Sequence, residues 1–234
     1  MHIMYMLGIL TFIFFAALIL MCFFREKLKH PLVNPLFIFV NAIFFFLWNI
    51  AMFEHRGESF EFMTFENISP YICTVIPLTP LMNRQVKSFA YSAIAFLGFG
   101  MLVALFISPE VEYLFNHHQD AQMIHITEAA CHLVMALYGF YLILSDKVKL
   151  ELKDYCKGLT FIYASIGFGV FLNLVFNRSN FGMDMYGDYS IYFLDIFGSF
   201  GATLVAYIVG VLAVMTLGFL VGNFVDRVSR RKKI

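Results

Sequence analysis

Long apolar stretches alternate with short charged segments along this 234-residue chain. Seven segments share the apolar pattern: Met4–Phe24, Leu36–Phe53, Ser69–Pro80, Ser88–Ile107, Met123–Leu144, Gly158–Phe176 and a last one from Ile191 to just before Arg227. Most are long enough to cross a hydrocarbon core of about 30 Å at about 1.5 Å of helical rise per residue. The pattern therefore predicts an all-α, polytopic membrane protein with seven transmembrane helices.

The third segment is irregular, because prolines stand at positions 70, 77 and 80. Proline kinks or breaks a helix, since it lacks the backbone N–H and its ring clashes with the preceding turn. Such breaks are tolerated at membrane depth where they face protein or a cavity instead of lipid. Gly98 and Gly100 in the fourth segment favour close helix packing.

Composition agrees with a membrane protein: 61% of the residues are hydrophobic and only 14% are charged, with a mean hydropathy of +0.78. Soluble domains carry nearer a quarter charged residues. Nothing in the pattern suggests a second, soluble domain, so we expect residues 1–234 to form one transmembrane domain in the cell membrane. The expected partners are membrane lipids and a lipid or small-molecule substrate, not nucleic acid.

Basic residues are divided very unevenly between alternate loops, although the formal net charge is zero. The loops after the first, third and fifth segments, together with the tail, hold 14 of the 16 Lys and Arg residues. The other side has only Arg56 and Arg178, with nine acidic residues. The positive-inside rule then predicts an outer N-terminus and a cytoplasmic C-terminus.

Ionisable side chains enter the fifth apolar segment in its first third, at His125, Glu128 and His132. Spacings of three and four place all three on one stripe of a helix. An acid in a membrane helix costs about 2.5–3.5 kcal/mol on insertion scales, so such residues usually face the protein interior. The stripe is either a self-satisfied structural pair or the polar core of an active site.

Other intramembrane polar residues fall in the same, outer half of the predicted bilayer. They are Asn49, Cys73, Asn173, Asn177 and Asp195. Together with Glu128 and His132, they predict a polar cavity that opens outward, with Asn49, Asn173 and Asn177 as candidate substrate-binding residues.

Cys73 is the natural nucleophile of this set, because helix starts favour the thiolate. His132 is the candidate base, with Glu128 or Asp195 orienting its imidazole. Taken alone, a membrane cysteine is more often a small packing residue. Cys131 is a poorer candidate, since it lies about 100° around the helix from His132, and nothing in the sequence argues for a Cys73–Cys131 disulfide.

A metal site is the weaker expectation. His125 and His132 are seven residues apart, about 10 Å along a helix axis, so they cannot both bind one tetrahedral ion at about 2 Å. We therefore predict no metal ligands and no cofactor.

These residues also carry a resemblance. The spacing from Cys73 to His132 and the stretch Cys131–Tyr138 are similar to those of the YwaF-like integral membrane family, which includes transmembrane protein 164. The segments 173–183 and 194–198 resemble the last loop and final helix of that family, and the likeness covers roughly residues 68–215. Bacterial members often have a His shortly before the Cys, where this chain has Tyr71.

The resemblance implies a seven-helix fold and, from the animal member, acyl transfer between phospholipids by a Cys and a His, which correspond to Cys73 and His132. More distant relatives cleave fatty-acid esters. We therefore expect an acyltransferase or lipid ester hydrolase. The alternatives are a non-enzymatic binding or transport protein for a small polar ligand and a purely structural membrane subunit.

Overall fold

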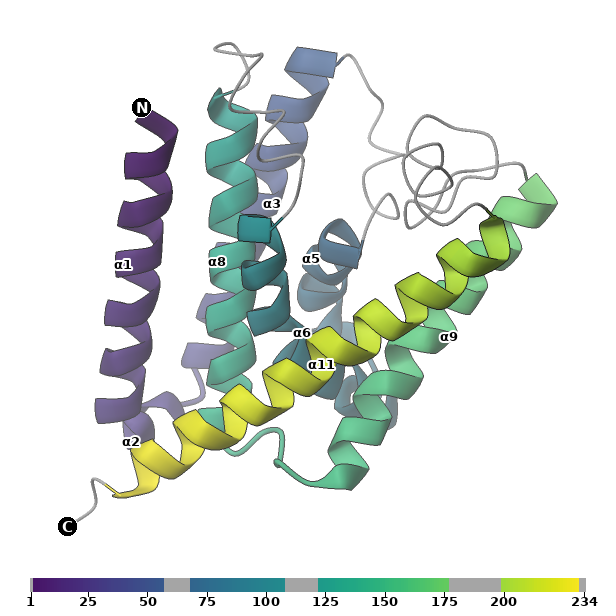
Figure 1. Cartoon of the computed structure of the whole chain (residues 1–234). Helices are drawn as coiled ribbons and strands as arrows, with labels where there is room; N and C mark the ends of the chain where they lie inside the picture. Colours follow the sequence, from purple (N-terminus) through teal and green to yellow (C-terminus); the bar gives the residue numbers. More distant parts are fainter. Residues whose placement is uncertain (1, 57–67, 108–121, 177–198, 232–234) are drawn as a thin grey trace.

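The computed structural model of the chain describes residues 2–56, 68–107, 122–176 and 199–231. Over these ranges the chain is helical and has no strand (Figure 1). The helices are α1 (His2–Phe23), α2 (Arg25–Leu28), α3 (Val33–Arg56), α5 (Ile68–Leu78), the 3-10 turn η1 (Thr79–Leu81), α6 (Arg84–Ile107), α8 (Gln122–Leu144), α9 (Leu152–Phe176) and α11 (Phe200–Arg231). The all-α class is confirmed.

Each of the seven predicted segments coincides with a helix, at least over its described part. Four are long and apolar enough to cross a membrane: Val33–Phe53, Ile126–Leu144, Leu152–Asn173 and Gly201–Arg231. Gly8–Phe23 and Ile68–Leu81 are shorter apolar helices. The start of α1 and the end of α11 lie at opposite ends of the bundle (Figure 1).

Two helix boundaries and one short helix differ from the prediction. The last helix does not end before Arg227 but continues to Arg231, and α9 begins at Leu152, before the predicted start at Gly158. The short helix α2 was not predicted. All three lie at the charged end of the bundle, where polar side chains pair with one another and so allow helices to continue past the apolar pattern.

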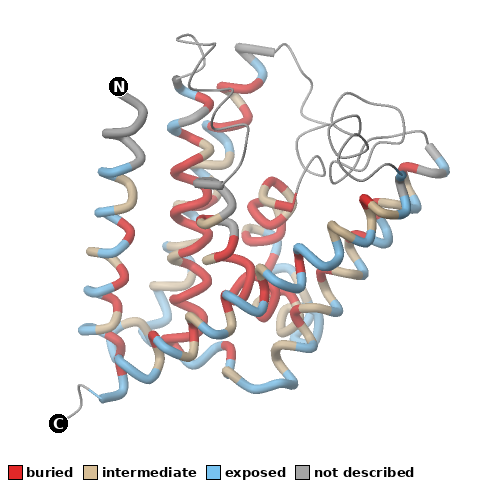
Figure 2. Tube along the Cα trace, in the orientation of Figure 1, coloured by how far each residue is buried: buried red, intermediate tan, exposed pale blue. Residues whose placement is uncertain are grey.

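Helix α8 is the centre of the bundle. It packs against α6, α3 and α1 and also contacts α5 and α11. In its membrane-length segment 89% of the residues are buried, and its tube is mostly red (Figure 2). A Cβ on Gly98 of α6 would come within 2.8 Å of the Met135 carbonyl oxygen of α8, so the predicted role of Gly98 in close packing is confirmed.

An ion network joins three helix ends at the basic end of the bundle. The buried Arg25 guanidinium donates to Asp226 Oδ1 at 2.6 Å and to Asp146 Oδ1 at 2.8 Å. Arg230 also donates to both carboxylates, and Lys29 Nζ lies 3.0 Å from Asp146 Oδ2. The network ties α2 to the end of α11 and to the turn after α8.

Asp146 closes helix α8 as well as joining this network. Its φ of 61° lies in the left-handed region, which Asp and Asn enter more easily than most residues. The Asp146 N–H donates to the Ile143 carbonyl and the Lys147 N–H donates to the Leu142 carbonyl, which is the Schellman pattern of helix termination. The turn thereby holds the carboxylate in place for its cationic partners.

Candidate functional site at the junction of α3, α5 and α8

Two prolines, Pro77 in α5 and Pro80 in η1, leave main-chain carbonyls without a helical hydrogen-bond donor. A helical carbonyl normally accepts from the N–H four residues later, and Pro77 and Pro80 have no N–H to offer Cys73 and Ile76. Asn41 Nδ2 of α3 donates to the Cys73 carbonyl at 2.9 Å, and Thr79 Oγ1 donates to the Ile76 carbonyl at 2.7 Å. A buried side-chain donor thus satisfies each carbonyl that a proline leaves without its helical partner.

This arrangement fixes the position of Cys73. The residue has no exposed surface and lies on α5, which packs against α3, α6 and α8. Its side chain lies beside that of Cys131 of α8. Both cysteines are free thiols. The thiol neighbour of Cys73 on α8 is therefore Cys131, the residue that helix rotation made the poorer candidate in the sequence.

His132 is buried one position further along α8, with 5% of its surface exposed. Its Nδ1 lies 2.8 Å from the main-chain oxygen of Glu128. A carbonyl oxygen can only accept, so Nδ1 carries the proton, and Nε2 of the neutral ring can take one up. The Trp48 ring lies 6.3 Å from the imidazole, between centroids. No hydrogen bond joins His132 to Cys73 among the described residues.

Two buried polar atoms beside these residues have no hydrogen-bond partner within the described ranges. They are the indole nitrogen Nε1 of Trp48 and the amide oxygen Oδ1 of Asn41. Buried polar groups are nearly always paired, and an unpaired one calls for an explanation. The two atoms are seven residues apart on α3, about 10 Å along its axis, so they are separate unpaired sites on that helix.

The structure does not gather all the predicted polar residues here. Asn49 is buried on α3, where its side chain donates to the Phe45 carbonyl at 2.7 Å. Asn173 is buried near the end of α9, which lies away from α3 and α8 (Figure 1). Asn177 and Asp195 lie outside the described residues, as does the side chain of His125.

Potential metal ligands are few in the described part of the chain. No three of its His, Cys, Asp and Glu side chains are grouped so as to hold an ion. The chemistry that the junction can support is that of thiols, one imidazole and neutral amide or indole groups.

Sequence reasoning did not identify Asn41, and it did not place Cys131 beside Cys73. For Asn41 the signal was present, because an Asn in an apolar helix seeks a partner and Pro77 leaves one carbonyl unpaired. The pairing could not be found without knowing that α3 lies against α5. The proximity of Cys131 to Cys73 could not be found either, because the rotation of α8 toward its neighbours is a tertiary property.

No known family model, curated protein or solved structure matches this chain, so the resemblance to the YwaF-like family remains a prediction.

Proposed function

We propose that this chain is an integral membrane acyltransferase or lipid ester hydrolase that uses Cys73 as its nucleophile and His132 as its base. The observation that carries the proposal is the placement of Cys73. The Asn41 side chain of α3 donates a hydrogen bond to the main-chain carbonyl of Cys73 and so holds the residue between α3, α5 and α8. The α8 turn beside it carries Cys131 and His132.

The reaction would begin with proton transfer from the Cys73 thiol to His132 Nε2. The thiolate attacks the ester carbonyl of a phospholipid, a C–S bond forms, and the ester C–O bond breaks. His132 gives its proton to the leaving alcohol oxygen, which releases a lysophospholipid. A second lipid hydroxyl, or water, then takes the acyl chain from the thioester.

The Nδ1 contact of His132 favours this role. In a catalytic Cys–His pair a third group holds Nδ1–H so that Nε2 faces the nucleophile. Here the main-chain carbonyl of Glu128 takes that position. No hydrogen bond joins His132 to Cys73 among the described residues, so a change of side-chain rotamer at Cys73 or His132 has to precede proton transfer.

The test is mass spectrometry of the full-length protein isolated with its lipids. We expect a hydroxylamine-labile acyl adduct on Cys73, absent in Cys73→Ala, and about 10²–10⁴-fold slower turnover in His132→Ala. Cys156→Ala changes an exposed thiol on α9 and serves as the matched control. Full lipid turnover in Cys73→Ala would contradict the proposal.

A second candidate is a binding or transport protein for a small polar ligand. The unpaired Trp48 indole and Asn41 amide oxygen favour it, because they offer a donor and an acceptor without any chemistry. Trp48 is the only tryptophan of the chain, so its fluorescence reports on this site alone. A ligand that shifts Trp48 emission equally in wild type and in Cys73→Ala, with no acyl adduct, would favour binding over catalysis.

We also propose seven membrane crossings, with the N-terminus outside and the C-terminus in the cytoplasm. The opposite positions of the α1 start and the α11 end support an odd number of crossings (Figure 1). Single cysteines at positions 61, 116 and 184, in a cysteine-free background, should react with an impermeant maleimide from outside, whereas those at 29, 149 and 232 should not. Outside labelling at position 149 would overturn this topology.

A further inference from the structure

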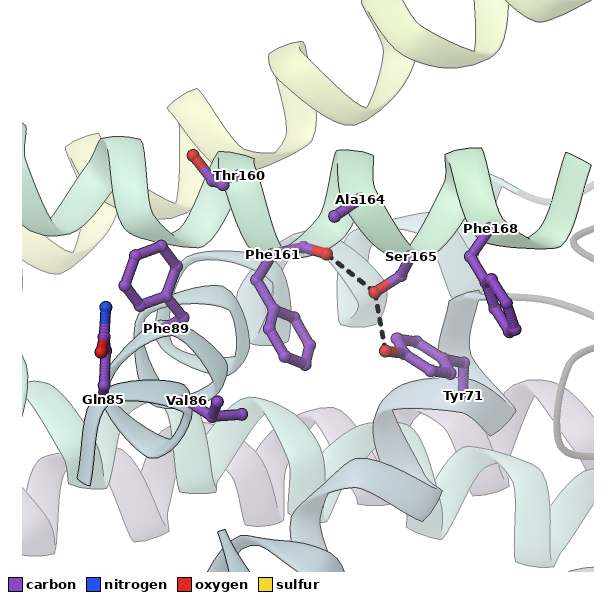
Figure 3. Close-up of a pocket in the computed structure, with 9 residues that line it drawn as sticks. All are labelled: Tyr71, Gln85, Val86, Phe89, Thr160, Phe161, Ala164, Ser165 and Phe168. Carbon is purple, nitrogen blue, oxygen red and sulfur yellow. Dashed lines mark hydrogen bonds between the residues drawn. The ribbon is translucent and has the colours of Figure 1, made fainter. Parts of the chain in front are cut away.

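A second region stands apart from the cysteine junction, on the other side of α5. An open groove of about 560 Å³ runs between α5, α6 and α9 (Figure 3). Its size falls in the range typical of small-molecule sites. Most of its lining is apolar, with Phe89 from α6 and Phe161 and Phe168 from α9. Helix α9, which forms one wall of the groove, is long and apolar enough to cross a membrane.

One hydrogen-bonded pair holds this groove together. Ser165 Oγ of α9 donates to the Phe161 carbonyl at 2.7 Å, which uses its only hydrogen. Tyr71 Oη of α5 lies 2.7 Å from Ser165 Oγ and must therefore be the donor between them (Figure 3). The Tyr71 ring also stacks on Phe161, with 6.3 Å between centroids. These contacts tie α5 to α9 at one end of the groove.

Two lysines of α9 lie beyond the opposite end of the groove, outside its lining. They are Lys157 and Lys153, which come four and eight residues before the lining residue Phe161. Lys157 Nζ reaches across to Ser88 of α6 at 3.1 Å, directly before the lining residue Phe89. Gln85 stands at this end in the close-up (Figure 3).

Charge at this end is only partly neutralised. Lys157 is paired with Asp154 at 2.5 Å, whereas Lys153 is exposed and forms no ion pair with any described residue. A basic pocket between membrane helices is the arrangement that recognises anionic lipid headgroups.

We propose that this groove binds one anionic phospholipid of the bilayer, with an acyl chain against the Phe89, Phe161 and Phe168 side chains and the phosphate at the Lys153–Lys157 end. The apolar lining selects a hydrocarbon chain, and the two lysines beyond its end select the negative headgroup. The proposal does not rest on acyl transfer at Cys73, because this lipid is bound and not consumed.

The test uses full-length protein in liposomes that carry phosphatidylglycerol with a diazirine in its acyl chain. A phosphatidylcholine with the same acyl chain is the comparison probe. Illumination followed by peptide mass spectrometry should place phosphatidylglycerol adducts on residues 85–89 and 160–168 in several-fold excess over phosphatidylcholine adducts. Lys153→Gln should reduce that preference about fivefold, the effect of one lysine near an anionic surface.

A space-filling variant tests the acyl-chain part of the proposal. Ala164 lines the groove and is exposed, so Ala164→Trp should fill the groove without disturbing the core, and adducts on 160–168 should fall to the yield seen on lipid-facing segments. Val209→Trp, at an exposed position of α11, is the matched control and should leave the adducts unchanged. Equal labelling by the two probes, or full labelling of Ala164→Trp, would overturn the proposal, whatever the outcome of the Cys73 experiments.

Discussion

Helices α8 and α11 are both apolar and long enough to span a membrane, but they have opposite environments. The α8 segment has a mean hydropathy of 1.5 and is 89% buried, whereas the α11 segment has a mean hydropathy of 2.6 and is 17% buried. In a water-soluble protein the more hydrophobic helix would be the more buried one. The inverse order indicates that lipid is the solvent of α11 and that protein surrounds α8.

The comparison also shows what holds each helix in place. Lipid tails are as apolar as leucine, so hydrophobic burial alone cannot bring α11 to the bundle. Two other features do so: the close approach of its backbone to α6, and the ion network that joins its end to α2 and to the turn after α8. Polar residues accumulate on α8 because protein groups satisfy them there.

Two glycines of α11 provide the most direct test of how this helix packs on α6. A Cβ on Gly218 would collide with the Phe96 carbonyl oxygen of α6, whereas a Cβ on Gly210 would meet nothing within 4 Å. We expect Gly218→Ala to lower the free energy of unfolding by about 3 kcal/mol, because a backbone carbonyl cannot move aside. Gly210→Ala should be neutral or slightly stabilising. Detergent–SDS unfolding followed by circular dichroism measures both, and equal values would contradict the packing of α11 on α6.

Removing the Arg25 guanidinium should have the next largest effect. Arg25→Gln leaves two carboxylates without their buried partner, and we expect a loss of about 2 kcal/mol, discounted because Asp146 is partly exposed and can be solvated. Lys27→Gln is the control, since Lys27 is exposed and lies outside the network. The same unfolding assay applies. Similar stability of the two variants would show that the network does not hold α11.

Asn41 tests whether a proline creates the need for a polar residue in the core. Asn41→Leu leaves the Cys73 carbonyl unpaired and should cost about 1 kcal/mol. In a Pro77→Ala background the restored N–H can pair with that carbonyl, so the same change should cost much less. Asn49→Leu is the control, because the Phe45 carbonyl also has a regular helical donor. Additive effects of Asn41→Leu and Pro77→Ala would contradict the pairing.

The smallest effect concerns pH at the basic end. Burial of Asp146 opposes its ionisation, but Lys29 and Arg25 outweigh this and hold the pKa of its carboxyl below the ordinary value. The stability that this carboxylate contributes is present above the unfolded-state pKa of about 3.9 and is lost as the pH falls through the lower folded-state pKa. Asp146→Asn tolerates the left-handed turn, so it removes only the charge.

The measurement is the midpoint of thermal unfolding from pH 6 downward. Wild type should lose stability below about pH 4, and Asp146→Asn should be less stable at pH 6 but show a smaller acid-induced decline. If the unfolding midpoints of the two proteins fall in parallel as the pH is lowered, groups other than Asp146 cause the loss of stability at acid pH.

The sequence by itself determined the all-α class, the helical segments, the interruption of the third segment, where α5 ends at Leu78 before the 3-10 turn, and the interior position of His132. These follow from local rules: apolar length sets the helices, proline lacks an N–H, and charge in an apolar helix demands an interior position. Gly98 was also placed correctly, since a glycine in an apolar helix commonly marks a close helix contact.

Only the tertiary structure decided which side chains meet. Cys131 of α8 lies beside Cys73, whereas no hydrogen bond joins Cys73 to His132 among the described residues. The packing of α3 on α5 brings Asn41 to the carbonyl that Pro77 leaves unpaired. The extension of α11 to Arg231 depends on partners from α2 and the α8 turn. Hydropathy along a chain says how much of a helix is apolar, but helix rotation and neighbour choice arise from contacts between residues far apart in sequence, such as Arg25 and Asp226.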